Sequence, residues 1–356
     1  MPQIPSDRAP GGAPAARAPA VTGGARQSSL REGNLALVAR TVCGAEEPLS
    51  RAGVAERTAM TRSTVSRLVD DLVAGGVLAE LDPLASTGRG RPATPLVAGG
   101  RLVALGLQVD VTLLSAKLVD LRGRVVAESV VEGDFLDSDP GETLVRLAAL
   151  SAAVVQRMPS ASRLVGAGLA LPGIVSTDSG RLLVAPNLGW SDLRPAALVD
   201  AAALGGMPLH VGNEASLAAR TVAEVVPGRP GPLTDFVYLS GEIGIGGAAV
   251  LGGRVMAGRH GWAGEIGHVC VDPSGPDCAC GSTGCLEQYA GRRALLAAAG
   301  LPADAGTTRL VDLVRSGDRA AADAVARAAW ALGVALAGVV NVLDIPAIVL
   351  GGHLGQ

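Results

Sequence analysis

A chain of 356 residues exceeds the length at which a single hydrophobic core usually stops growing, so we expect more than one domain. Hydrophobic residues make up 48% of the chain and aromatic residues only 2%, so leucine, valine and alanine must fill the cores. No run of about 20 uninterrupted apolar residues occurs, and no basic segment precedes an apolar one at the N-terminus. These features argue against a membrane span and a secretory signal, and we expect a cytoplasmic protein.

The N-terminal residues 1–27 are rich in proline, alanine and glycine. Such a composition cannot bury enough apolar surface to offset the entropy of the chain. We therefore expect a disordered tail over residues 1–27. The first 100 residues are slightly basic, with 11 arginines against 9 acidic residues, but this asymmetry is too small to identify a partner.

Three helices are predicted after the tail, at about Leu30 to Val42, Ser50 to Arg57 and Arg62 to Ala74. Thr61 is placed to cap the third helix. The apolar residues of that helix form one stripe, which consists of Val65, Leu68, Val69 and Leu72. Its other face carries the polar residues Arg62, Ser63, Thr64, Ser66 and Arg67. The spacing is typical of a helix-turn-helix whose second helix enters a DNA major groove.

A glycine- and arginine-rich segment follows, Gly88 to Pro92, flanked by short apolar runs. We interpret it as the wing of a winged helix, with Arg89 and Arg91 able to enter a narrow minor groove. The alternative is a solvated turn on a generic three-helix domain. The order of capped helix, polar outer face and wing favours a DNA-binding domain over residues 28–98.

From Leu102 onward, predicted strands alternate with helices, which indicates an α/β chain. The expected strands are 102–109, 113–120, 125–132, 164–170, 209–211, 236–239, 248–251 and 347–350, and the expected long helices are 141–158 and 319–342. Prolines near residues 227–232 suggest a division into two lobes, residues 99–229 and residues 230–356.

Four soft or borderline ligands lie within eighteen residues, at His268, Cys278, Cys280 and Cys285. Zinc takes thiolate and imidazole ligands in closed tetrahedral sites, and nearby glycines allow the necessary turns. The sequence therefore predicts a structural Zn²⁺ site; the alternative is a set of unrelated buried thiols. We expect the other two cysteines, Cys270 and Cys43, to be small buried hydrophobic residues.

The same segment carries a family resemblance. Gly264-Glu-Ile-Gly-His268, followed by Cys278-Ala-Cys-Gly-Ser-Thr-Gly-Cys-Leu-Glu287, resembles the signature of the ROK family, which joins sugar kinases with sugar-responsive repressors. The resemblance covers about residues 30–356. It implies a ribonuclease-H-like, actin-like fold of two lobes, with sugar and nucleotide meeting between them. It also implies one further helical segment after residue 356, so we expect the second lobe to be incomplete.

Three features that the ROK kinases need are altered here. The first glycine turn becomes Gln108-Val-Asp-Val-Thr112, and the second becomes Glu242-Ile-Gly-Ile-Gly-Gly247. Each now has a carboxylate where a phosphate would have to lie. At the general-base position, Glu214 replaces the aspartate, and a displacement of about 1 Å can cost about a hundredfold in rate. These departures predict that the protein is not an enzyme.

The positions that contact sugar in the family are retained. They fall on Asn213, Glu214, Glu265, His268 and Glu287, with Asn187 as a further candidate. Glu265 and Glu287 could instead be solvated surface carboxylates, and Asn187 a turn-forming residue. Trp190 could pack on a sugar or hold its loop in place. For His268 we expect the metal-ligand role first, with any sugar contact from its second ring nitrogen.

Together these patterns predict a sugar-responsive transcriptional regulator, in the manner of the xylose-repressor-like ROK proteins. The protein would form a homodimer or homotetramer, and a sugar or sugar phosphate would bind between the two lobes of a chain. Binding of this effector would change how the protein binds a palindromic operator. The alternative is an ATP-dependent, glucokinase-like ROK sugar kinase with a fused DNA-binding domain. Turnover of ATP with a panel of hexoses separates the two.

Overall fold

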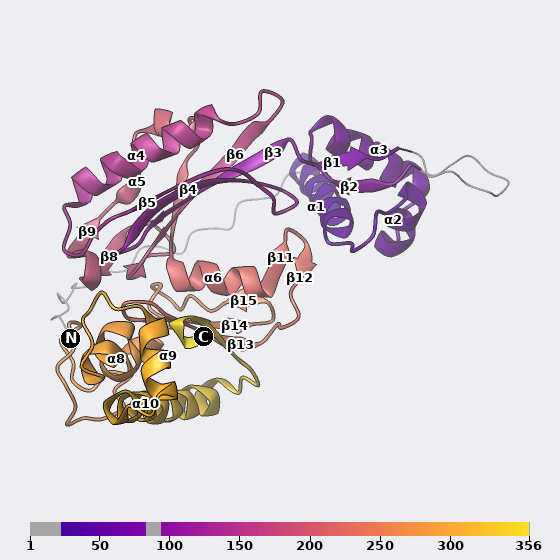
Figure 1. Ribbon diagram of the computed structural model, residues 1–356. Helices are drawn as coiled ribbons and strands as arrows, with labels where there is room; N and C mark the ends of the chain where they lie inside the picture. Colours follow the sequence, from indigo (N-terminus) through magenta and orange to yellow (C-terminus); the bar gives the residue numbers. More distant parts are fainter. Residues whose placement is uncertain (1–22, 83–93, 356) are drawn as a thin grey trace, which may run out of the picture. The chain divides into compact units, whose positions relative to one another are not determined.

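The computed structural model describes residues 23–82 and 94–355 (Figure 1). It divides into two compact units: residues up to Leu102 together with Val226–Arg229, and residues Val103–Val225 together with those from Pro230 onward. The division at Leu102 falls close to the boundary that the sequence predicted at residue 98.

The first unit is a three-helix domain made of α1 (Gly23–Cys43), α2 (Arg51–Thr58) and α3 (Arg62–Ala74). Helix α1 begins inside the segment that composition predicted to be a disordered tail, because no proline lies between residue 20 and that helix to stop it. The three helices pack around a core that includes Val38, Val54, Val65 and Leu68.

Helices α2 and α3, which the sequence predicted as a helix-turn-helix, are joined by a short turn. Ser50 caps α2 by accepting a hydrogen bond from the Gly53 amide at 3.1 Å, and Thr61 caps α3 by accepting one from the Thr64 amide at 3.2 Å. Between them, Ala59 takes a left-handed conformation with φ 53°. The two caps and the left-handed residue fix where α3 begins.

Arg51 joins the two helices to the following strand. Its guanidinium pairs with Asp70 at 2.7 Å and with Glu80 at 2.8 Å, and it also donates to the Ser66 carbonyl at 3.1 Å. Strand β1 (Leu78–Glu80) pairs antiparallel with β2 (Leu96–Ala98). These strands form the base of the predicted wing, but Arg89 and Arg91 lie outside the described residues.

The second unit begins with a five-stranded sheet in the order β10-β6-β3-β4-β5. Strands β3, β4 and β5 are antiparallel neighbours, whereas β10 runs parallel to β6. Helix α4 packs on one face of this sheet (Figure 1). The bounds are β3 Leu102–Val109, β4 Leu113–Asp120, β5 Val125–Glu132, β6 Arg163–Leu171, β10 Leu209–Asn213 and α4 Pro140–Gln156.

Short elements connect β6 to β10 and onward to the second sheet. A three-stranded antiparallel sheet, β7-β8-β9, follows β6 directly. The bounds are β7 Ile174–Val175, β8 Leu182–Ala185, η1 Pro186–Leu188, β9 Trp190–Leu193, α5 Pro195–Leu198, η2 Ala201–Leu204, α6 Glu214–Ala223, β11 Glu224–Val226 and β12 Arg229–Pro230.

A second hydrophobic core surrounds the four-stranded sheet β15-β14-β13-β16. Strand β16 runs parallel to β13, with Leu239 paired with Leu350, so a long crossover connects the two strands. The bounds are β13 Phe236–Gly241, β14 Ile245–Leu251, β15 Arg254–Val255, η3 Ile266–His268, α7 Glu287–Ala290, α8 Arg292–Ala298, α9 Thr307–Arg315, α10 Arg319–Leu343, β16 Ile348–Gly352 and η4 His353–Gly355.

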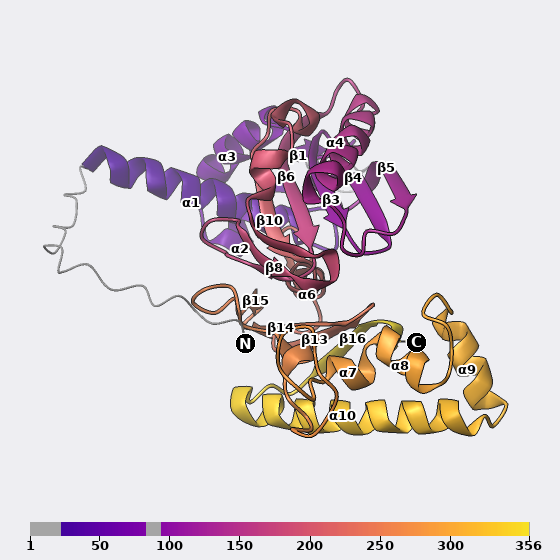
Figure 2. The ribbon, with the colours of Figure 1, turned by 90° about the vertical axis from the view of Figure 1, so that its left-hand side faces the viewer.

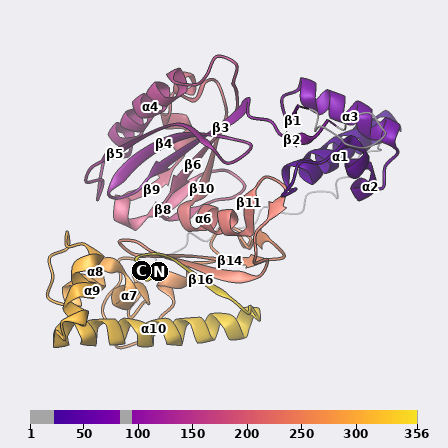
Figure 3. The same cartoon turned by 45° about the vertical axis from the view of Figure 1, so that its right-hand side comes forward.

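Helix α10 is the longest element, and α7, α8 and α9 pack along it (Figures 2 and 3). By length and composition this helix could cross a membrane, which is weak evidence because core helices of soluble proteins pass the same test. A stripe of alanines at helical spacing faces the core, at residues 321, 324, 328, 331 and 335. Small side chains on that stripe let the helix pack closely on its neighbours.

Candidate functional site

One cleft in the second unit gathers the residues that the family resemblance assigned to sugar. Its cavity measures about 80 Å³. The elements that reach it are the ends of β3, β10 and β13, together with η1, η3 and the start of α7. Its lining includes all six predicted residues, which are Asn187, Asn213, Glu214, Glu265, His268 and Glu287. Contact with a sugar remains a prediction.

Asn213 lies at the junction between β10 and α6, and both ends of its amide are bonded within the protein. The side-chain oxygen accepts from the Ser216 amide at 2.9 Å and so caps α6, and the side-chain nitrogen donates to the Gly173 carbonyl at 2.9 Å. This bonding fixes the start of α6, where Glu214 is the first residue. A ligand contact by Asn213 would have to use the remaining lone pair of its oxygen.

Glu214 is the most perturbed carboxyl group of the cleft. Burial, with smaller contributions from the charges of Asp110 and Glu242, raises its pKa from 4.5 to about 8, against a hydrogen bond with Gln108 that lowers it. Burial and the charge of Asp110 also raise the pKa of Glu242. Glu214 is therefore largely protonated at neutral pH and a poor proton acceptor there.

The raised pKa makes the stability of the fold depend on pH through Glu214. The folded chain holds this proton more tightly than the unfolded chain, so the stabilisation is complete below about pH 4.5 and is lost as pH rises through about 8. We expect the free energy of unfolding to fall by several kcal/mol between those limits, and Glu214→Gln to remove most of that fall. Denaturant titrations at pH 5 and pH 9 measure the difference.

The matched control is Glu132→Gln, which changes an exposed glutamate on β5. This control should follow the wild-type pH dependence. Equal pH dependence in wild type and Glu214→Gln would show that the Glu214 carboxyl is not held in its protonated form by the fold.

In each of the two altered glycine turns, one backbone amide donates to a carboxylate of the protein. Asp110 accepts hydrogen bonds from the amide of Thr112 at 2.9 Å and from its hydroxyl at 2.7 Å. Glu287 accepts from the Ile245 amide at 2.9 Å. A Cβ added at Gly244 would overlap the Glu287 carboxylate. Amides that could otherwise cradle a phosphate are thus already bonded to negative charges.

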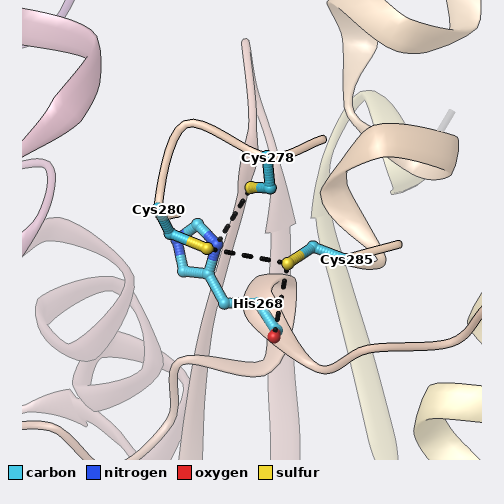
Figure 4. A group of neighbouring side chains, drawn as sticks. All are labelled: His268, Cys278, Cys280 and Cys285. Carbon is cyan, nitrogen blue, oxygen red and sulfur yellow. Dashed lines mark hydrogen bonds between the residues drawn. The ribbon is translucent and has the colours of Figure 1, made fainter. Parts of the chain in front are cut away.

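A second cluster adjoins the cleft. The ligand atoms of His268, Cys278, Cys280 and Cys285 all lie within 4.8 Å of one another (Figure 4). The Cys280 and Cys285 sulfurs are 3.7 Å apart, and the Cys278 sulfur is 3.7 Å from Nδ1 of His268. Two thiolates bound at about 2.3 Å to a tetrahedral zinc ion would lie about 3.8 Å apart. The four side chains therefore fit one metal ion.

Burial and the neighbouring thiols raise the pKa of Cys285 to about 12. A bound cation would reverse this effect, because metal ligation stabilises the thiolate form. All five cysteines of the chain are free thiols.

His268 links the metal cluster to the cleft. Its Nδ1 faces the thiols, while its Nε2 lies 4.0 Å from Oε2 of Glu265. Burial raises the pKa of Glu265, and His268 opposes that shift. Ala279, between two of the cysteines, also lines the cleft. The arrangement agrees with the expectation that one histidine nitrogen serves the metal and the other serves the cleft.

Five of the residues predicted to contact DNA lie on α3. On α3, Arg62, Ser63 and Arg67 are exposed, whereas Thr64 and Ser66 are partly buried. Thr64 is also bonded through its hydroxyl to Thr61 at 2.8 Å, so the exposed polar surface of α3 is narrower than the sequence suggested.

The structure also settles the environment of two residues outside the predicted site. Trp190 is 2% exposed and donates from its indole nitrogen to the Ser138 carbonyl at 2.8 Å, so it holds its loop in place. The expectation that Cys270 is buried is wrong: its side chain is exposed, and it lies outside the cluster of four potential metal ligands.

The sequence did not predict the hydrogen bond that the Ile245 amide of the second turn donates to the Glu287 carboxylate. The two residues are 42 positions apart, and no local pattern places a carboxylate against the Ile245 amide. It also missed Gln108, which lies beside Glu214 and lowers its pKa. A polar residue at the end of an otherwise apolar strand was the one available signal for Gln108.

Comparison with known proteins identifies the family. Residues 104–356 match the model of the ROK family. The chain is 28% identical over 337 residues to a putative xylose repressor of Caldicellulosiruptor, covering 90% of this chain and 83% of that protein. It is 29% identical over 326 residues to the transcriptional dual regulator NagC of Escherichia coli, covering 87% and 78%.

Two solved structures resemble the fold. A ROK-family transcriptional regulator, a homologue of the E. coli MLC protein, superposes with a TM-score of 0.73 at 24% identity, covering 92% of this chain and 84% of that one. A ROK glucokinase from Streptomyces griseus has a TM-score of 0.57 at 26% identity, covering 70% and 83%. The α/β fold predicted from the sequence is thereby confirmed, and the chain belongs to the ROK family.

Proposed function

We propose that this protein is a sugar-responsive transcriptional repressor of carbohydrate genes. The observation that carries the proposal is the pairing, in one chain, of a capped helix-turn-helix with a cleft in which each altered turn has an amide bonded to a carboxylate. The repressor names of relatives that span most of the chain support it. A DNA-binding protein without an intact nucleotide cradle has no evident use for ATP.

Operator binding is assigned to α3. Arg62 and Arg67 are exposed on this helix and form no ion pair within the described part of the chain. Guanidinium groups on a recognition helix contact phosphates and guanine edges in the major groove. Arg89 and Arg91 are proposed to enter the adjacent minor groove, and the operator is expected to be a palindrome read by a homodimer or homotetramer.

The test uses a duplex selected from random DNA by the full chain. Removing both guanidinium groups, in Arg62→Ala with Arg67→Ala, should weaken binding to this duplex about a hundredfold and reduce the salt dependence. Arg309→Ala with Arg327→Ala, on exposed positions of α9 and α10, removes the same charge and should change affinity little. Equal losses in the two variants would contradict the assignment to α3.

The effector is proposed to bind between the lobes and to favour one of their arrangements, since a ligand with no such preference shifts nothing. The metal at His268, Cys278, Cys280 and Cys285 is proposed to be a structural zinc ion, whose ligands would fix the loop that carries Glu265 toward the cleft. A DNA partner and free thiols favour the cytoplasm.

Catalysis is the outcome that would overturn this proposal. Glu214 stands at the general-base position but holds its proton near neutral pH, and in each turn one amide is bonded to a carboxylate that would repel a phosphate. The full chain should therefore not turn over ATP with any of a panel of hexoses. Clear turnover that Glu214→Ala abolishes would make the protein a kinase.

A further inference from the structure

The charge of the cleft sets which ligands it can accept. Five carboxyl groups line it, those of Asp110, Glu214, Glu242, Glu265 and Glu287. Among the described residues, no lysine or arginine lines it, and His268 is the one basic side chain that does. Arg292 lies close enough to lower the pKa of Glu242, but it is not part of the lining.

The carboxyl groups stand on two sides of the cleft. Asp110, Glu214 and Glu242 lie at the ends of β3, β10 and β13, and the charge of Asp110 acts on both glutamates. Glu265 and Glu287 interact on the other side, next to the loop that carries Cys278, Cys280 and Cys285, which we call the metal loop. A ring held in the cleft would therefore have a carboxyl group near it in either orientation. A phosphate on that ring would meet repulsion rather than a counter-charge.

Part of the backbone that could bind a phosphate is occupied. Phosphate sites in proteins are built from arginine or lysine side chains and from free amide donors. In the two turns that face the cleft, the Thr112 amide is bonded to Asp110 and the Ile245 amide to Glu287. The described lining thus lacks a lysine or arginine to balance a phosphate, and one amide donor of each turn is bonded to a carboxylate.

We propose that Asp110 and Glu242 are specificity-determining residues that exclude phosphorylated ligands, so that the effector is an unphosphorylated sugar. This inference rests on the proposed function, and it narrows the class of effector that the sequence left as a sugar or a sugar phosphate. Asp110 acts directly as a charge and also by occupying the Thr112 amide. Glu242 adds a second charge at the other turn. Neither residue is assigned to the sugar ring.

The test measures binding of matched pairs to the full chain by calorimetry at low salt. The pairs are glucose with glucose 6-phosphate and N-acetylglucosamine with N-acetylglucosamine 6-phosphate, and xylose is added as a single probe. Wherever a sugar binds, we expect its phosphate to bind at least about tenfold more weakly, and this ratio to shrink as salt is added.

The variant Asp110→Asn with Glu242→Gln keeps the size of both side chains and, at residue 110, an oxygen that can accept from Thr112. It should reduce the preference for the unphosphorylated sugar about tenfold. The control is Asp304→Asn with Asp312→Asn, which removes the same charge from exposed positions outside the cleft and should leave the preference unchanged.

Three results would overturn the inference. The first is a sugar phosphate that binds the wild type as tightly as its parent sugar, and the second is an equal change of preference in both double variants. Either result would leave the proposed repressor function standing. The third is a wild type that binds neither the sugars nor their phosphates, which would overturn the proposed sugar response and this inference with it.

Discussion

Replacing Cys285 with serine is expected to remove the bound metal and to destabilise the second hydrophobic core. Cys285 is fully buried, and its sulfur lies 3.7 Å from that of Cys280. Loss of one thiolate leaves three ligands, and structural zinc sites contribute directly to folding free energy. We expect the wild type to contain about one zinc ion per chain, and Cys285→Ser to lose the metal together with several kcal/mol of stability.

Elemental analysis and thermal denaturation, each with and without a chelator, measure both effects. Cys270→Ser is the matched control, because this thiol is exposed and lies outside the ligand cluster. The control should keep its metal and its melting temperature. A metal-free wild type, or a chelator that leaves the melting temperature unchanged, would refute the structural role.

Loss of the metal should also weaken sugar binding in the cleft. His268 turns one nitrogen to the thiols and the other toward Glu265, and Ala279 of the metal loop lines the cleft. The loop has no helix or strand of its own between η3 and α7 and is held by isolated bridges and turns, so a metal would add to the bonds that fix it. Sugar binding should therefore weaken in Cys285→Ser at temperatures where the rest of the chain is still folded.

The regular parts of the fold could be predicted from local patterns. The strands 102–109, 113–120 and 125–132 and the helix 62–74 have the bounds that their apolar periodicity and the Thr61 cap indicated. Each is long enough for its period to be read. The short strands β7, β8 and β9 were not predicted, because two to four residues cannot show a period.

The site was predictable only where one segment carries it. The spacing over eighteen residues predicted four potential metal ligands, and the structure brings all four side chains together. The raised pKa of Glu214 depends on β3, β10 and β13 ending at one place, and the bond from Ile245 to Glu287 depends on α7 returning to the β13–β14 turn. Such convergence is set by tertiary packing and leaves no mark in a local pattern.

Replacing Gly173 with alanine is expected to damage the cleft without removing any of its side chains. Gly173 has φ +95°, a conformation that residues with a Cβ rarely adopt. A Cβ there would overlap the Val184 carbonyl and lie 2.7 Å from Cα of Ala185. The Gly173 carbonyl also receives the amide of Asn213 at 2.9 Å. Any shift that relieves the overlap must therefore disturb the start of α6, where Glu214 lies.

Gly206→Ala separates the two contributions to this effect. Gly206 also has a left-handed φ, +76°, but a Cβ there would meet nothing within 4 Å. This control should therefore lower the free energy of unfolding only by the backbone strain, about 1 kcal/mol, and leave sugar binding intact. Gly173→Ala should cost about 3 kcal/mol or more and weaken binding of the sugar at least tenfold. Equal losses of stability in the two variants, with sugar binding retained in both, would show that the Gly173 backbone does not position the cleft.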